Sequence, residues 1–262
     1  MSQKIYQIDA FADTLFSGNP AAVCPLENWL DADIMQKIAA ENNLAETAFT
    51  VPVENGYEIR WFTPEVEVDL CGHATLASAY TLMNFEGFSG EKINFFSRNS
   101  GTLTVTKNGD FLTLDFPKDN LLKVEDLAIF EKCFGYQPIE AYQGKTDYLL
   151  IFENEHQIQN IEPNIPEIAK INARGVIVSS ISENYDFVSR FFGPNCGVNE
   201  DPVTGSAHTT LTPFWAEKLG KTKLTAKQIS KRGGVLECEL KNDRVLISGK
   251  CKTYLKGEIF IN

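Results

Sequence analysis

The chain has 262 residues, of which 43% are hydrophobic and 23% charged, and its formal net charge is −11 at pH 7. This size and composition are typical of a globular protein with two domains of ordinary size. The acidic balance disfavours nonspecific binding to nucleic acid or to an anionic membrane. No apolar run approaches the ~20 residues of a membrane-spanning helix, and the N-terminus alternates like a strand, so we expect a cytoplasmic protein.

The cysteines and histidines do not form a recognisable pattern of metal ligands. Six cysteines are scattered along the chain, and only three histidines accompany them. No C-x-x-C pair occurs, which argues against a disulfide framework and against a structural zinc site. The glycine-rich motifs that bind phosphate are missing as well. We therefore expect neither a metal ion nor a nucleotide cofactor.

The first half of the chain is predicted to contain strands around two helices. Asp31 is a candidate N-cap for a first helix that ends at Asn42-Asn43. A second helix, from Gly72 to Asn84, is apolar on every side, which is typical of a helix buried in its domain. Asn108-Gly109 is a hairpin signal. The strands predicted by alternation are 4–11, 21–24, 44–51, 57–62, 93–96, 103–107 and 111–116.

Residues 117–124 are predicted to link the two halves. They divide the chain into an N-terminal domain, 1–117, and a C-terminal domain, 118–262, although the last strand could return to the first domain. Helices are predicted near 125–134, 166–171 and 206–219, with Gly220 as the C-cap of the third. The predicted strands of this half are 148–153, 175–180, 187–192, 234–240 and 244–248. Each half therefore wraps strands around one inner helix.

The two halves share a pair of landmarks in the same order. RWFTP at 60–64 precedes CGHA at 71–74, and RFFGP at 190–194 precedes TGSA at 204–207. The second copy is longer between its landmarks, in the stretch 195–202. A shared register that continues into the following hairpins favours two related halves, with a ligand between them.

Each copy ends in a Gly-X-Ala segment at a predicted helix start. The first turn of a helix leaves N–H groups unpaired and carries partial positive charge, so Gly72 with Ala74 and Gly205 with Ser206 could hold a carboxylate. The alternative is that small residues serve the close packing of a buried helix. Duplication favours the ligand-binding interpretation modestly.

Three polar residues flank the predicted helix starts. His73 is expected to be neutral, because a helix N-terminus disfavours imidazolium, and to act as a hydrogen-bond donor or an acid–base partner. Asp201, restrained by Pro202 to an extended conformation, could be an acid or a base, although such residues commonly cap helices. Ser206 could cap the helix or bind a ligand, and each of these residues also has an ordinary structural role open to it.

Glu46 is the strongest candidate for a base. It shares a strand face with the small residues Ala48 and Thr50, where partial desolvation would raise its pKa. The alternative is an ordinary solvated strand face. Cys71 could transfer a proton at a helix N-terminus, but Thr204 occupies the matching position, so a two-thiol mechanism lacks its second thiol.

Together, these segments resemble the PhzF family, the phenazine biosynthesis-like proteins. The resemblance is carried by NLAETAF at 43–49, LCGHAT at 70–75, SRFFGP at 189–194 and EDPVTGSAH at 200–208, and it covers essentially the whole chain. It implies a diaminopimelate epimerase-like α+β fold of two pseudo-symmetric domains, each a mostly antiparallel sheet or barrel around a central helix. It also implies an active site between the domains and a homodimer.

The resemblance further implies a cofactor-independent isomerase that moves a proton within a small cyclic or amino carboxylic acid. It assigns catalysis to Glu46, His73 and Asp201, and substrate binding to Gly72, Ala74, Gly205 and Ser206. The related epimerases use a cysteine in each half, so Cys71 opposite Thr204 favours a single shuttle base. Two alternatives stay open, namely an amino-acid racemase or epimerase that uses Cys71 and a non-catalytic protein that binds a small ligand.

Overall fold

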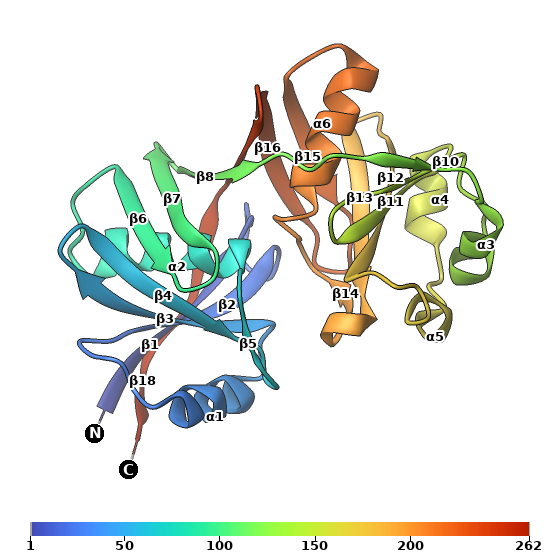
Figure 1. The fold of residues 1–262 in the computed structure, drawn as a ribbon. Helices are drawn as coiled ribbons and strands as arrows, with labels where there is room; N and C mark the ends of the chain where they lie inside the picture. Colours follow the sequence, from blue (N-terminus) through green and yellow to red (C-terminus); the bar gives the residue numbers. More distant parts are fainter. Residues whose placement is uncertain (1, 262) are drawn as a thin grey trace. The chain divides into compact units, whose positions relative to one another are not determined.

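The chain forms two compact units in the computed structural model, which describes residues 2–261. One unit comprises Met1–Asp115 together with Ser248–Asn262, and the other comprises Phe116–Ile247. The C-terminal segment, which the division at 118–262 assigns to the second domain, groups with the first because β18 (Cys251–Phe260) pairs with β1 (Ser2–Ala10). Figure 1 shows β1 and β18 side by side in the first unit.

The first unit consists of strands and two helices. Besides β1 and β18, its strands are β2 (Asn19–Pro25), β3 (Glu46–Val53), β4 (Gly56–Phe62), β5 (Glu67–Val68), β6 (Lys92–Ser97), β7 (Gly101–Asn108) and β8 (Phe111–Pro117). Its helices are α1 (Ala32–Asn42) and α2 (Gly72–Phe85). Among the described residues, no helix is long and apolar enough to cross a membrane.

Helix α2 is the inner helix of the first unit. It packs against strands β1, β2, β3, β7 and β18. Its hydroxyl side chains are satisfied within the helix, since Thr75, Ser78 and Thr81 each donate to the carbonyl four residues earlier. This local bonding allows polar residues in a helix that is buried along most of its length.

Helix α1 covers the other face of the same strands. Met35 and Ala39 of α1 belong to a buried cluster with Phe49 and Phe62. Phe49 and Phe62 meet edge to face, with ring centroids 5.6 Å apart. Because side chains alternate along a strand, Glu46, Ala48 and Thr50 lie on the face opposite Phe49.

The second unit repeats this arrangement with more helices. Its strands are β9 (Leu122–Val124), β10 (Glu140–Gln143), β11 (Asp147–Ile151), β12 (Gly175–Ile181), β13 (Phe187–Gly193), β14 (Val198–Asp201), β15 (Lys223–Gln228), β16 (Gly234–Lys241) and β17 (Arg244–Gly249). Its helices are α3 (Ala128–Phe134), α4 (Glu155–Asn160), α5 (Ile165–Ile168), α6 (His208–Leu219) and the 3-10 helix η1 (Pro194–Cys196).

Helices α3, α4 and α5 cover one face of the second unit, and α6 is its inner helix. Phe130 and Ile158 belong to the buried cluster beneath the outer helices, together with Val178 of β12. On α6, Trp215 stacks on Phe187 of β13 with ring centroids 5.8 Å apart. Its indole N–H donates to Oγ of Ser179 at 2.9 Å, so the polar atom of this buried ring is satisfied.

The strand pairing confirms the pseudo-symmetry. Strands β18, β1, β2, β3, β4, β6 and β7 pair in that order, and β9, β10, β11, β12, β13, β15 and β16 pair in the same order with the same directions. The parallel pairings are β2 with β3 and β4 with β6 in the first unit, and β11 with β12 and β13 with β15 in the second. A short strand also pairs with the same member of each sheet, β5 with β4 and β14 with β13. Arg60 lies opposite Phe49 of β3, and Arg190 lies opposite Val178 of β12, so Phe49 and Val178 correspond. Three residues before them, Gly175 is therefore the counterpart of Glu46.

The first landmark of the repeat has a structural role in both units. The Arg60 guanidinium makes a bidentate contact with Glu67, at 2.7 and 2.6 Å, and lies 5.1 Å from the Phe62 ring centroid. Arg190 makes the same contact with Glu200, at 2.7 and 3.1 Å. Paired and stacked on a ring, each arginine ties strand β4 or β13 to the short strand beside it.

Two predicted elements differ in the structure, and helix α4 and strands β5, β10, β14 and β15 were not predicted. The predicted linker contains strand β9, which pairs with β10, so residues 122–124 are part of a sheet. Helix α6 begins at His208 and not at Ser206, because residues 205–207 form a turn whose carbonyls accept from the N–H groups three residues later. Helix α4 was not predicted, since it is short and mostly polar; Asn154 caps it by accepting from the Gln157 N–H.

Acid is expected to destabilise the second unit through His208. Burial lowers the pKa of this histidine to about 4, with Nδ1 2.9 Å from the Thr204 carbonyl. The unfolded chain binds the proton near pH 6.5, so stability present above that pH is lost as the pH falls towards 4. We expect about 2 kcal/mol less stability at pH 5 than at pH 7 from this group.

Urea unfolding at the two pH values, followed by hydrogen exchange in α6, measures this loss. His208→Gln should remove most of it, while His156→Gln, at an exposed position of α4, should retain it. An equal pH dependence in wild type and His208→Gln would contradict the assignment.

Candidate active site

Glu46 begins strand β3 on the face that looks toward α2. Its parallel partner in β2 is Ala21, which is fully buried and leaves space beside the carboxylate. The Glu46 side chain is only 17% exposed, so the expectation of an ordinary solvated strand face is wrong. A largely buried carboxylate with small neighbours has the position that a proton-transfer group needs.

His73, in the first turn of α2, lies directly against Glu46. Nε2 of His73 is 3.1 Å from Oε2 of Glu46. Oε2 is buried, and no hydrogen bond of acceptable geometry reaches it. The contact between the two side chains is therefore electrostatic. The structure thus brings together two residues that lie far apart in the sequence.

Cys71 and Asn19 complete the surroundings of the imidazole. Cys71 Sγ is 3.5 Å from Nδ1 of His73, and Nδ2 of Asn19 is 3.3 Å from the same nitrogen. Sequence reasoning missed Asn19, whose only signal is the Gly-Asn-Pro loop. Gly18 fixes this loop at φ +72°, where an added Cβ would lie 2.2 Å from the Ala10 carbonyl oxygen.

The protonation of His73 is opposite to the expectation of a neutral ring. Burial lowers the pKa of His73, but Cys71 and Glu46 raise it, and the net direction is well above the ordinary value. A full carboxylate charge in contact outweighs the partial charge of a helix start. Burial, together with Glu46, raises the pKa of the Cys71 thiol to about 11, against the influence of His73 and of the Ala74 N–H.

We expect Glu46→Gln to lower the pKa of His73, because burial lowers this pKa and the substitution removes one of the two groups that raise it. Ring NMR across a pH titration measures this, with His73→Gln to assign the signal. The same pair should stabilise the first unit fully below about pH 6.5 and lose that contribution as the pH rises through the raised pKa of His73. Glu41→Gln on the exposed face of α1 is the matched control, and an unchanged His73 titration in Glu46→Gln would refute the coupling.

In the second unit, Ser206 is held by an arginine that the sequence did not single out. Nη1 of Arg174 donates to Oγ of Ser206 at 3.1 Å, and the guanidinium pairs with the buried carboxylate of Asp147. Burial lowers the pKa of Arg174, but its bonds to Asp147 raise it, and the net direction is upward. Ser206 does not cap α6, whose N-cap is Ala207.

Asp201 lies at the end of β14 and is bonded within its own unit. Its Oδ2 accepts from Thr204 Oγ1 at 2.5 Å, and its carbonyl accepts from Gln228 Nε2 at 2.7 Å. The Gln228 amide oxygen also accepts from the Thr204 N–H at 2.8 Å. These bonds fix the carboxylate, whereas the neighbouring Glu200 is engaged by Arg190 and is structural.

The counterpart of Glu46 in the second unit cannot carry a side chain. A Cβ added at Gly175 would lie 2.3 Å from Cζ of Phe191. The preceding residue, Arg174, places its guanidinium 5.4 Å from the Phe191 ring centroid. At this position of the repeat, the first unit therefore has the carboxylate of Glu46. The second unit has a glycine, preceded by the cationic side chain of Arg174.

The two predicted helix starts also differ. Helix α2 begins at Gly72, as predicted, and its N-cap Cys71 makes no side-chain cap bond. Gly205 and Ser206 instead lie in the turn before α6, where their carbonyls accept from His208 and Thr209. The Gly-X-Ala segment that occurs in both halves is thus a helix N-terminus at His73 and a turn at Ser206.

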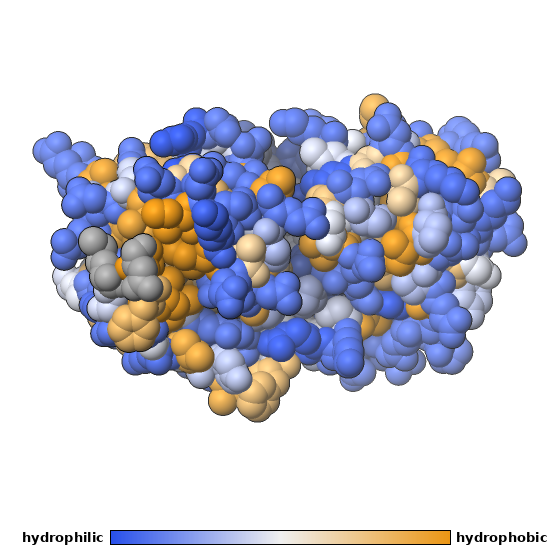
Figure 2. All heavy atoms as spheres, turned by 90° about the horizontal axis from the view of Figure 1, so that it is seen from below, coloured by the Kyte–Doolittle hydropathy of each residue, from blue (hydrophilic) through white to orange (hydrophobic). Residues whose placement is uncertain are grey.

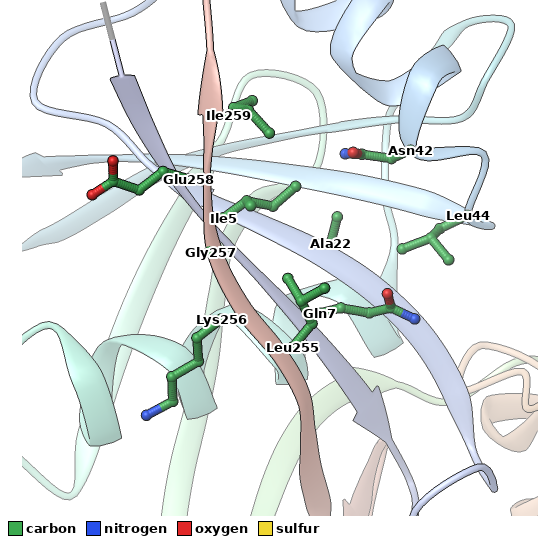
Figure 3. Close-up of a pocket in the computed structure, with 10 residues that line it drawn as sticks. All are labelled: Ile5, Gln7, Ala22, Asn42, Leu44, Leu255, Lys256, Gly257, Glu258 and Ile259. Carbon is green, nitrogen blue, oxygen red and sulfur yellow. The ribbon is translucent and has the colours of Figure 1, made fainter.

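A separate pocket of about 330 Å³ lies on the α1 side of the first unit (Figure 3). Three strands and the end of α1 contribute its lining, namely Ile5, Gln7, Ala22, Asn42, Leu44 and residues 255–259. Ala22 neighbours Ala21 along β2 and points to the opposite face, so this pocket is not the Glu46 site. Figure 2 shows apolar surface on this unit, whose exposed large apolar side chains include Phe16, Tyr254 and Phe260.

One cluster among the described residues has donor atoms suited to a metal ion. A carboxylate oxygen of Glu46, Sγ of Cys71 and a ring nitrogen of His73 all lie within 4.8 Å of one another. Two of these residues, Glu46 and His73, were predicted to be catalytic, and Cys71 was the alternative base; the third predicted catalytic residue, Asp201, is not in the cluster.

Comparisons with known proteins agree with this fold. The family model described as "Phenazine biosynthesis-like protein" matches residues 8–257. An uncharacterized isomerase of Pseudomonas aeruginosa is 48% identical over the whole of both chains. The crystal structure of a PhzF-family phenazine biosynthesis protein from Enterococcus faecalis superposes with a TM-score of 0.97, at 46% identity and over 100% of each chain.

A more distant structure shows the wider fold. A hydroxyproline epimerase from Agrobacterium vitis, solved with trans-4-hydroxy-L-proline bound, matches with a TM-score of 0.61. The match covers 98% of this chain and 92% of that one at 10% identity, so it bears on the fold alone. The α+β architecture is thus that of the pseudo-symmetric epimerases. This chain belongs to the PhzF family of phenazine biosynthesis-like proteins and is an isomerase of that family.

Proposed function

We propose that this isomerase moves a proton within a small carboxylic acid and that Glu46 is the base that carries it. The observation behind this proposal is the contact between Glu46 and His73 at the start of α2. Glu46 would accept a proton from a C–H bond, leaving the electron pair delocalised into the substrate, and would deliver a proton to another carbon after its carboxyl proton has exchanged with the solvent. Substrate and product then have the same composition, and no co-reactant is needed.

The charge state of the pair supports this assignment. The raised pKa of His73 favours an imidazolium beside Glu46, so a positive charge lies next to the proposed base. The first-turn N–H groups at Gly72 and Ala74 would favour negative charge on a bound carboxylate. General acid–base catalysis of this kind contributes about 10²–10⁴-fold to a rate.

The second unit is proposed to supply the remaining predicted residues. Asp201 is fixed by Thr204 and Gln228, and Ser206 is fixed by Arg174. Arg174 would add a positive charge for a carboxylate, and Gly205 would contribute backbone in the turn before α6. That these residues act on the same substrate as Glu46 remains a prediction from the family resemblance, as does the homodimer.

A second candidate uses Cys71 as the base, as in an amino-acid racemase or epimerase. The observation that favours it is the thiol 3.5 Å from His73. The burial that raises the pKa of Cys71 counts against it, because the thiolate is the reactive form. Cys71→Ser would abolish turnover under this mechanism and would spare much of it under the Glu46 mechanism.

The test begins with a thermal-shift screen of cyclic and amino carboxylic acids against the full chain. Acids that stabilise the protein are then incubated with it in deuterated water, and their increase in mass is measured by mass spectrometry. Uptake of deuterium into a stabilising acid supports proton transfer. Stabilisation without uptake across both classes of acid would defeat the proposal.

A further inference from the structure

We propose that Glu46, Cys71 and His73 form a binding site for a thiophilic divalent cation, Zn²⁺ in particular, and that the bound ion inhibits the enzyme. The inhibitory half of the proposal rests on the proposed function of Glu46. The binding half rests on donor atoms, distances and burial alone.

The donor atoms lie near the spacing that a four-coordinate ion requires. Bonds of 2.0–2.3 Å from zinc to N, O and S place tetrahedral donors ~3.3–3.6 Å apart. Nε2 of His73 lies 3.1 Å from Oε2 of Glu46 and 4.0 Å from Sγ of Cys71. All three donor atoms lie within 4.8 Å of one another, so movements of these side chains would bring them around one ion.

The charges and the burial also suit such an ion. Once His73 and Cys71 release their protons on binding, a carboxylate, a thiolate and a neutral imidazole balance a divalent cation, and this mixed N, O and S set favours zinc over magnesium or calcium. The Glu46 Oε2 atom is buried and makes no aligned hydrogen bond, so a cation would take the place of the His73 ring proton beside it. Three protein ligands leave the fourth position open to water or to a ligand carboxylate.

Asn19 has the position of a supporting residue. Its carboxamide lies 3.3 Å from Nδ1, the ring nitrogen that would not bind the ion. Histidines that bind metals generally donate their other N–H to an oxygen, so the Asn19 carboxamide, which now presents Nδ2, would turn its Oδ1 toward Nδ1 when an ion binds. An ion held at Nε2 and Oε2 would block the base and its partner together.

Cobalt provides a readout that does not depend on the substrate. Chelator-treated full-length protein, titrated with Co²⁺, should bind one ion per chain and develop the near-ultraviolet thiolate charge-transfer band of a Co²⁺–S bond, and Zn²⁺ should displace it. Cys71→Ser should lose this band, and Glu46→Gln should bind at least about tenfold more weakly. Cys196→Ser removes an exposed thiol outside the cluster and should keep the band.

Wild-type protein offers a second measurement in case a variant fails to fold. Zn²⁺ should slow alkylation of Cys71, followed by peptide mass spectrometry, and leave that of Cys196 unchanged. No band in wild type, or a band lost only in Cys196→Ser, would overturn the site.

Inhibition is tested separately, with the ligand identified by deuterium uptake. Zn²⁺ should stop the uptake, and a chelator should restore it. Binding without inhibition would overturn the regulatory half and leave the site standing. Conversely, a cobalt band in a protein whose Glu46→Gln variant exchanges deuterium normally would sink the glutamate mechanism and not the site.

Discussion

Glu46→Gln is expected to slow deuterium uptake into the substrate by about 10²–10⁴-fold, because glutamine keeps the size of the side chain and removes the base. The folded state should be retained, since the side chain lies at the start of β3 and Oε2 makes no aligned hydrogen bond. Mass spectrometry of the acid in deuterated water gives the rate, and the thermal shift with the same acid reports binding.

The comparison with two further variants makes this result specific. Glu41→Gln changes the same side chain on the exposed face of α1 and should exchange at the wild-type rate. Cys71→Ser should remain measurably active if Glu46 is the base. Wild-type exchange in Glu46→Gln, with Cys71→Ser inactive, would replace the glutamate mechanism by the thiol mechanism.

Arg190→Met is expected to destabilise the second unit by about 3–5 kcal/mol, the cost of breaking a buried ion pair. The Arg190 side chain is 11% exposed and pairs with Glu200. Its Nη1 also donates to the carbonyls of Ile158 and Ile161, at 3.0 and 2.8 Å. Methionine would leave one carboxylate and two carbonyls without these partners, so the loss exceeds that of a surface pair.

The internal repeat supplies the matched control. Arg60 makes the same bidentate contact with Glu67, whose side chain is 39% exposed. Arg60→Met should therefore cost less, because water can solvate the carboxylate that remains. Hydrogen exchange, read separately in β12 and β13 and in β3 and β4, resolves the two units. An equal loss in both variants would show that the extra bonds of Arg190 contribute nothing measurable.

Much of the fold followed from local patterns. The apolar run after Gly72 predicted a buried inner helix, and α2 begins at that residue. Asn108-Gly109 predicted the hairpin of β7 and β8, and Gly109 takes a positive φ of 59° there. Helix α4 and several strands, among them β9, β10 and β15, escaped prediction because they are short and their pairing and packing come from segments elsewhere in the chain.

The site was predictable in its residue types and not in its contacts. The resemblance singled out Glu46 and His73, yet only the parallel pairing of β2 with β3 over α2 places them 3.1 Å apart. The same contact reversed the expected protonation of His73. Arg174 carried no motif, and its role beside Ser206 appears only through the salt bridge with Asp147.

The sequence by itself determined that the chain is doubled, that each half surrounds an inner helix and that its first landmark recurs. It could do so because periodicity and repetition are local properties of a chain. Tertiary structure decided what the copies do. Arg60 and Arg190 are buried braces, Glu46 has no counterpart because the Phe191 ring fills the space at Gly175, and the helix start at Gly72 becomes a turn at Gly205. Such differences depend on which side chains, distant in the sequence, pack against one another, and these contacts exist only in the folded chain.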